Sequence, residues 1–406
     1  MNEKRLYKDI PWTTDARTTV IIGFLLRMVM LIVIVYMLDG IWDMYYLEDD
    51  KMYEEVAKKY LENSRGLIDG DLLFELTRGW SAPFWVYVLC ISGKLMGTMY
   101  ASRFINVILS TLCIVATYNL TYEISGNQKV SLTAARLFAF LPFPILISCF
   151  PFKDLFIMYG VMYTFRLFVR VQNDRKLSIG QVILCVILLI CMFYTRGAVT
   201  ELMLFFLLAY YILKLYRKKS YLAILALVAI TAAVVVVFRN QLFAAFDNKI
   251  EEYSNYGAED ASGLNAIRVT SLLDIYKLPL AYAFSMLQPV RLELFTISSS
   301  TRPWFTVITY ANLTMFPVAM GAWLYMFVKK HNLFFWLSSF IMFAAVIMLS
   351  LGVSRHYLFL LPVHMINYSL YLDDTQKNFK NRRTLVILGT FALLAMVFCY
   401  SLVKLL

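Results

Sequence analysis

Eleven apolar stretches, each 17 to 25 residues long, run through the 406-residue chain and limit the folds that it can adopt. They are residues 18–38, 103–122, 131–149, 155–171, 179–195, 198–216, 220–238, 304–328, 333–351, 356–372 and 384–403. About 20 apolar residues in a helix cross the hydrocarbon core of a bilayer. Only 16% of the residues are charged, whereas about 25% is usual in soluble domains. The sequence therefore predicts an all-α integral membrane protein with about eleven transmembrane helices.

The positions of Lys and Arg predict the orientation, because cytoplasmic loops of membrane proteins are enriched in these residues. Basic clusters lie in the leader 1–17, at Arg175 and Lys176, and at residues 217–219, whereas the short turns on the other side hold one Lys or Arg each. We therefore expect a multi-pass protein of the cell membrane with a cytoplasmic N-terminus. Its two large loops, residues 39–102 and 239–303, then face outward.

Residues 80–93 form a twelfth apolar stretch that is too short to cross the bilayer comfortably. If it did cross, every later basic cluster would face outward, against the positive-inside rule. We therefore predict an interfacial helix in the first outer loop, with Trp80, Trp85 and Tyr87 at headgroup depth.

The chain divides into four predicted segments. They are a cytoplasmic leader (1–17), a membrane module that includes the outer loop 39–102 (18–238), a large extracytoplasmic loop (239–303) and C-terminal transmembrane helices (304–406). The net charge of +11 comes from clusters between spans, which suits contact with anionic lipid headgroups rather than nucleic acid. The six cysteines lie in or beside apolar segments without paired spacing, so neither disulfides nor a zinc site is predicted.

Three consecutive acids, Glu48, Asp49 and Asp50, follow the first span by about ten residues. A helical stripe, residues 53, 56, 57 and 60, comes directly after them. Acids at a helix N-terminus interact favourably with the helix dipole, so a solvated cap is one interpretation. The other is a carboxylate at the membrane surface that takes a proton from an acceptor hydroxyl or amine.

The segment Asp49-Asp50-Lys-Met-Tyr53 resembles the Asp-Asp/Glu-x-x-Tyr motif that opens the first outer loop of GT-C-fold glycosyltransferases. This superfamily includes the family 39 enzymes, the bacterial aminoarabinose transferases and the protein O-mannosyltransferases. Four later segments are similar to its interfacial helix, second span, third span and late Arg-Tyr-containing signature. They are Pro83 to Gly97, Arg103-Phe-Ile-Asn-Val, Ala134 to Pro142, and Ser354-Arg-His-Tyr-Leu-Phe-Leu-Leu-Pro362.

The resemblance implies a polyprenyl-phosphate-linked sugar as donor, taken from the outer leaflet and transferred with inversion. The acceptor is an extracytoplasmic lipid, cell-wall polysaccharide or protein. The resemblance also implies that Asp49 is the catalytic carboxylate, that Asp50 is its neighbour and that Tyr53 supports substrate binding. In contrast to many members, we expect no soluble C-terminal domain, which leaves acceptor recognition to the two outer loops.

Polyprenyl phosphate is the leaving group of such a reaction, so an outward-facing cation should stabilise the emerging phosphate. Lys153, Arg196, Arg355 and His356 meet this requirement in the predicted topology. Ordinary snorkelling at the interface is the alternative for Lys153 and Arg355. For Arg196 the alternative is a structural ion pair, for instance with Glu201.

No cofactor is predicted, although a divalent metal remains open. Asp154 is the only acid in the second outer loop, and the adjacent Lys153 would compete with a metal for it. Two other functions also remain open. An O-antigen-type polymerase or ligase would depend more on outer-loop Arg residues, and a glycolipid flippase or transporter would place several ionisable residues at mid-membrane, where this sequence has only Arg27.

Overall fold

The computed structural model describes residues 10–37, 48–78, 82–173, 175–217 and 361–374, together with isolated positions between 307 and 325 and at 387. Every regular element in this part of the chain is helical, as the sequence predicts. The first elements are α1 (Thr14–Ile32), the π-helical turn η1 (Val33–Met37), α2 (Glu48–Asn63), α3 (Gly70–Thr77) and α4 (Pro83–Met96). They are followed by α5 (Ala101–Ser125), α6 (Gln128–Phe140), α7 (Pro142–Ile147), α8 (Asp154–Gln172), α9 (Ile179–Arg217) and α16 (Leu361–Asp374).

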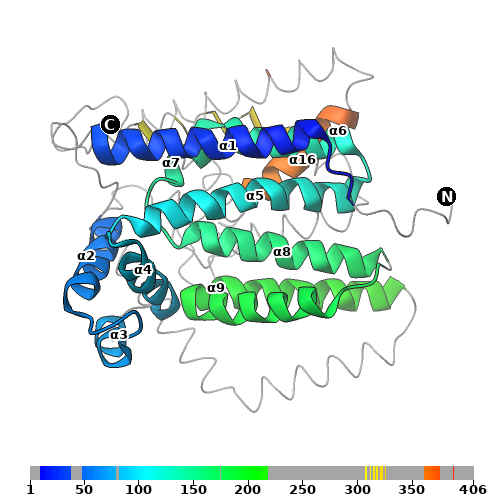
Figure 1. Cartoon of the computed structure of the whole chain (residues 1–406). Helices are drawn as coiled ribbons and strands as arrows, with labels where there is room; N and C mark the ends of the chain where they lie inside the picture. Colours follow the sequence, from blue (N-terminus) through cyan, green and yellow to red (C-terminus); the bar gives the residue numbers. More distant parts are fainter. Residues whose placement is uncertain are drawn as a thin grey trace, which may run out of the picture.

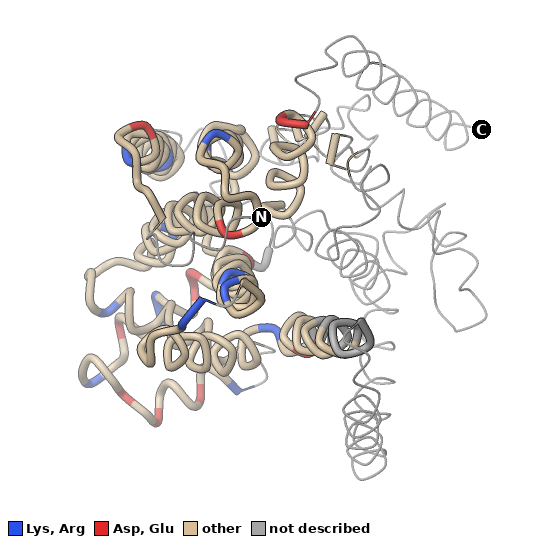
Figure 2. The backbone as a smooth tube through the Cα atoms, turned by 90° about the vertical axis from the view of Figure 1, so that its right-hand side faces the viewer, with Lys and Arg blue, Asp and Glu red and all other residues tan. Residues whose placement is uncertain are grey.

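The long helices form a bundle in which α5 packs against α1, α6 and α8, and α8 packs against α9 (Figure 1). Helices α2, α3 and α4 gather beyond one end of this bundle, which we call the α2 end. The loop between α5 and α6 lies at the opposite end. When the bundle is viewed along its helices, most of the described backbone belongs to uncharged residues (Figure 2).

Three described helices are long and apolar enough to cross a bilayer: Thr14–Tyr36, Ala101–Ser125 and Ile179–Gly197. They contain or closely match the predicted spans 18–38, 103–122 and 179–195. These apolar helices indicate that the chain is a membrane protein. The total of eleven spans, the orientation and the division into four segments stay predictions.

The predicted span at 131–149 is not one continuous helix, because the structure breaks it into α6 and α7. Leu141, between them, has an extended backbone with φ −68° and ψ 137°. Pro142 explains the break: its ring disfavours a helical conformation in the preceding residue, and it has no N–H to donate.

The helix predicted at 80–93 is present as α4, which runs from Pro83 to Met96 and packs on α2 and α5, and its interfacial position stays a prediction. Pro83 suits a first helical turn, and Gly97, at φ 68°, supplies the left-handed cap that ends the helix. Trp85 is fully buried and its indole N–H donates to the carbonyl of Pro151 at 3.0 Å, so it packs inside the protein, and its expected headgroup depth stays a prediction. Tyr87 is half-buried, and Trp80 lies outside the described residues.

Arg27 is buried where α1, α5 and α6 meet. Its guanidinium donates to Ser110 Oγ at 2.8 Å and to the carbonyls of Gly23, Ala139 and Phe138 at 2.9, 3.0 and 2.9 Å. These bonds offset part of the cost of a charge inside the membrane. Arg27 is therefore a structural residue that ties three helices together.

The topology predicts opposite labelling at the two ends of the bundle. Lys58 on α2 and Lys176 before α9 are both exposed. In a cysteine-free background, the Lys58→Cys variant should react with an impermeant maleimide on intact cells. The Lys176→Cys variant should react only after permeabilisation, and equal labelling of both on intact cells would contradict the orientation.

Candidate functional site

The first three turns of α2 bury a mixed polar and apolar stripe. Asp50, Tyr53, Glu54 and Ala57 are all buried, and their spacing of three and four residues places them on one face of the helix. The predicted stripe 53, 56, 57 and 60 is buried throughout and is thus confirmed. Because an isolated buried carboxylate is costly, Glu54 requires a charged or hydrogen-bonding partner.

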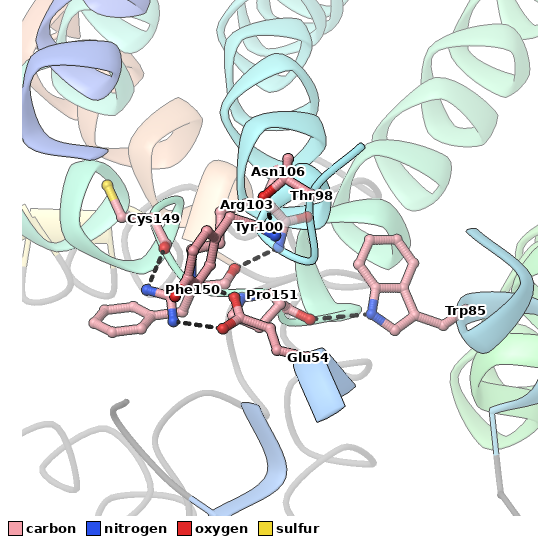
Figure 3. A network of polar contacts seen from close by, with 9 residues as sticks. All are labelled: Glu54, Trp85, Thr98, Tyr100, Arg103, Asn106, Cys149, Phe150 and Pro151. Atoms are coloured by element: carbon pink, nitrogen blue, oxygen red, sulfur yellow. Dashed lines mark hydrogen bonds and ion pairs between the residues drawn. The ribbon is translucent and has the colours of Figure 1, made fainter. Parts of the chain in front are cut away.

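Arg103, in the first turn of α5, is the partner of Glu54 (Figure 3). The guanidinium contacts both carboxylate oxygens, through Nε to Oε1 and through Nη2 to Oε2, the latter at 3.1 Å. Both side chains are fully buried. The rings of Tyr100 and Phe150 lie 5.8 and 5.9 Å from the guanidinium carbon, within the range of cation–π attraction. This bidentate pair joins helix α2 to the bundle.

The loop between α7 and α8 is held by side chains that bond its consecutive carbonyls (Figure 3). Arg103 Nη1 donates to Cys149 O at 3.4 Å, and Trp85 Nε1 donates to Pro151 O. Asn106 Nδ2 donates to Phe150 O at 2.5 Å and to Phe152 O at 2.9 Å. Buried non-helical backbone needs such partners, because no water reaches it. The bonds fix the loop and thereby the positions of Lys153 and Asp154, which follow it.

Asp154 begins α8 and forms a second buried ion pair. Its Oδ1 lies 2.8 Å from Nη1 of Arg196. Arg196 occupies a break in α9, where φ is −159° and ψ is 81°, between the predicted spans 179–195 and 198–216. The structural ion pair considered for Arg196 therefore exists, but with Asp154 rather than with Glu201, which is exposed.

The structure brings some of the predicted site residues together at the α2 end. Asp49 belongs to the first turn of α2, directly before the buried Asp50, although its side chain lies outside the described part. Lys153 is half-buried between the fixed loop and Asp154. Arg355 and His356 also lie outside the described residues. Among the residues that are described, no group of three His, Cys, Asp or Glu side chains is placed to hold a metal ion.

The sequence analysis missed Glu54, Arg103 and Asn106 as site residues. A signal for Glu54 was present, because Asp50, Tyr53, Glu54 and Ala57 follow the i, i+3, i+4, i+7 pattern of a buried helix face. For Arg103 the signal was a cation in the first turn of an apolar span, which needs a partner.

Helices α2, α3 and α4 form a folded cap whose connections are also fixed. The Tyr60 hydroxyl donates to Leu67 O at 3.0 Å and accepts from Asp69 N–H at 2.8 Å. The backbone N–H groups of Arg65 and Leu72 donate to the Asp69 carboxylate and lower its pKa. Burial raises the pKa of the Cys90 thiol on α4 to about 12, so this thiol stays protonated and unreactive.

A bundle of apolar helices with a folded helical cap and two buried acid–arginine pairs at one end defines a helical membrane protein with a candidate site at that end. No known protein-family model matches the sequence, and no curated protein matches it. The structure is similar to the apo form of the oligosaccharyltransferase of Archaeoglobus fulgidus, at 15% identity over 95% of this chain, with a TM-score of 0.50.

Another structure, the archaeal enzyme with an inhibitory peptide and a dolichol-phosphate, matches at 14% identity, 95% coverage of this chain and a TM-score of 0.48. This chain spans about half of the matched proteins, 55% in both cases. The likeness to the apo enzyme concerns the fold alone, and it agrees with the all-helical architecture predicted from the sequence.

Proposed function

We propose that this chain is a membrane glycosyltransferase that transfers a sugar from a polyprenyl-phosphate carrier to an extracytoplasmic acceptor, with inversion. One observation supports the proposal most strongly. Arg103 bonds both Glu54, near the acidic start of α2, and the fixed loop that precedes Lys153 and Asp154. The acidic start of α2 is therefore held at the end of the bundle that bears Lys153 and Asp154. The fold shared with an oligosaccharyltransferase supports it. The acceptor is a lipid, a cell-wall polysaccharide or a protein.

In the proposed reaction, Asp49 accepts the proton of the acceptor hydroxyl or amine as that group attacks the anomeric carbon. The bond between this carbon and the phosphate oxygen breaks, and polyprenyl phosphate leaves with the bonding electrons. Asp50, one residue further along α2, faces inward. We assign it the role of orienting the first turn, and we assign the buried Tyr53 the role of packing α2 rather than of direct substrate contact.

The departing phosphate needs a cation near the membrane surface, where a lowered dielectric strengthens its effect. Lys153 is our first candidate, because it follows a loop whose carbonyls are individually bonded and so has a fixed backbone position. Arg196 contributes less in this proposal, because Asp154 already neutralises it. Arg355 and His356 remain candidates because the predicted topology places them on the outer face.

A panel of polyprenyl-phosphate sugars, incubated with the purified full chain and membrane extract as acceptor, tests this function. We expect one donor to release polyprenyl phosphate in step with labelling of an acceptor. Release from none of the donors, or movement of a glycolipid across vesicles without release, would contradict the enzyme and favour the transporter.

We also predict that the transfer is independent of divalent metal. Arg196 already holds Asp154, and a metal would have to displace this guanidinium. Activity should therefore persist in excess EDTA. A loss of activity in EDTA that Mn²⁺ or Mg²⁺ restores would show that Asp154 or another acid binds a metal.

A further inference from the structure

Four charged residues meet at the end of the bundle opposite the candidate active site. Glu123 lies in the last turn of α5, Arg166 and Arg170 lie in the last two turns of α8, and Arg175 follows in the connection to α9. We call the three arginines around Glu123 the arginine cluster. Together with Glu123, the three arginines carry a net charge of +2.

Glu123 is buried and forms ion pairs with two of the arginines. Arg175 Nη1 lies 2.7 Å from its Oε2, and Arg170 Nε lies 3.8 Å from its Oε1. Neither of these two contacts has the geometry of a hydrogen bond. Asn173 Nδ2 donates to the Glu123 carbonyl at 2.9 Å, and Arg175 N donates to Arg170 O at 2.9 Å. These two hydrogen bonds fix the backbone around the arginine cluster. The guanidiniums of the cluster still have N–H donors available.

Arg166 has unused hydrogen-bonding capacity in its guanidinium. It lies one helical turn before Arg170, on the same face of α8. Its Nε is buried and has no hydrogen-bond partner, and the same holds for Nε of Arg170. A guanidinium carries five N–H donors, and unpaired buried donors are costly. An anion at this position would satisfy both Nε groups and balance the surplus charge.

The arginine cluster extends across the end of the predicted span 155–171, because Arg166 and Arg170 lie inside this span and Arg175 lies beyond it. Arg166 precedes the end of α8, at Gln172, by six residues, which corresponds to about 9 Å along the helix. A long arginine side chain near the end of a span can extend toward the headgroup region. Tyr163 and Tyr159 continue the stripe toward the bilayer centre, with their rings 6.1 Å apart. A phosphate held by the arginines would therefore have its acyl chains beside these rings.

We propose that the arginine cluster binds the phosphate of an anionic phospholipid headgroup. Guanidiniums bind phosphate oxygens in a bidentate manner, and basic pockets between transmembrane helices are known to suit anionic headgroups. Glu123 preorganises Arg170 and Arg175 and leaves the surplus charge for the lipid. The site is independent of the proposed sugar transfer, because it lies at the other end of the bundle.

Native mass spectrometry of the detergent-solubilised full chain tests the proposal. Titrations with phosphatidylglycerol and with phosphatidylcholine of the same acyl chains should show about tenfold tighter binding of the anionic lipid. The Arg166→Gln variant should lose about tenfold in this affinity. The Lys129→Gln variant is the matched control, because it removes an exposed positive charge near the same end of the bundle and should bind as the wild type does.

Arg166→Lys is a second variant in case Arg166→Gln does not fold, and it should bind with intermediate affinity because it keeps the charge but loses the bidentate geometry.

Inorganic phosphate at millimolar concentration should fail to displace the lipid, and displacement would overturn the lipid as the source of the phosphate. Equal binding of the two lipids, or wild-type affinity in both Arg166 variants, would overturn the site itself.

Discussion

The Asp49→Asn variant should transfer sugar at least about 10²-fold more slowly than the wild type, at normal expression and with donor binding intact. Asparagine keeps the size of the side chain and most of its hydrogen bonds, but it cannot accept the proton of the acceptor. Initial rates of polyprenyl phosphate release measure the effect. The expected result separates a general base from a helix cap, because Asn caps a helix nearly as well as Asp does.

Two neighbouring variants serve as controls for this prediction. Glu48→Gln should cost least, because Glu48 precedes the matched motif. Asp50→Asn should reduce the rate less than Asp49→Asn does, but it should also lower stability, because Asp50 is fully buried. Near-normal transfer by Asp49→Asn would remove the catalytic assignment and leave the three acids as a cap of α2.

The Glu54→Gln variant should lower the free energy of unfolding by about 3–5 kcal/mol, because it removes one partner of the buried Glu54–Arg103 ion pair. Arg103 also donates to Cys149 O, so the loss should loosen the loop before Lys153 and reduce transfer as well. Thermal unfolding of the detergent-solubilised protein gives the stability. Glu55→Gln is the matched control, since Glu55 is the next residue on α2 and is exposed.

A double variant distinguishes the ion pair from general damage to the core. Replacement of a buried ion pair by apolar residues of similar volume is often neutral or stabilising, so Glu54→Leu combined with Arg103→Met should recover much of the lost stability. If Glu54→Gln melts at the same temperature as Glu55→Gln, the pair does not fasten α2 to the bundle.

Local signals in the sequence predict most of the described helices. Apolar runs of span length locate α1, α5, α8 and both parts of α9, and Pro83 and Gly97 mark the ends of α4. The break at Pro142 was harder to predict, because transmembrane helices can tolerate proline when neighbouring groups satisfy the freed carbonyl. Whether such partners exist depends on tertiary packing.

The candidate site was only partly predictable for the same reason. The acids at the start of α2 stand out in the sequence, but the partner of Glu54 lies 49 residues further along the chain. The partner of Asp154 lies 42 residues away. A single sequence does not show which of several distant arginines pairs with a given carboxylate. The burial of Trp85 was also missed, because an aromatic side chain with one polar atom suits both an interface and a core.

Photocrosslinking of a lipid donor tests the central claim, that the α2 end is the site of sugar transfer, most directly. A polyprenyl phosphate with a diazirine beside the phosphate would be irradiated with the full chain in membranes. Excess phosphatidylglycerol would be present to occupy the arginine cluster, and the labelled peptides would be mapped by mass spectrometry. Crosslinks should fall within residues 48–58, 98–106 or 148–155, and labelling confined to residues 123–130 or 166–178 would contradict the account.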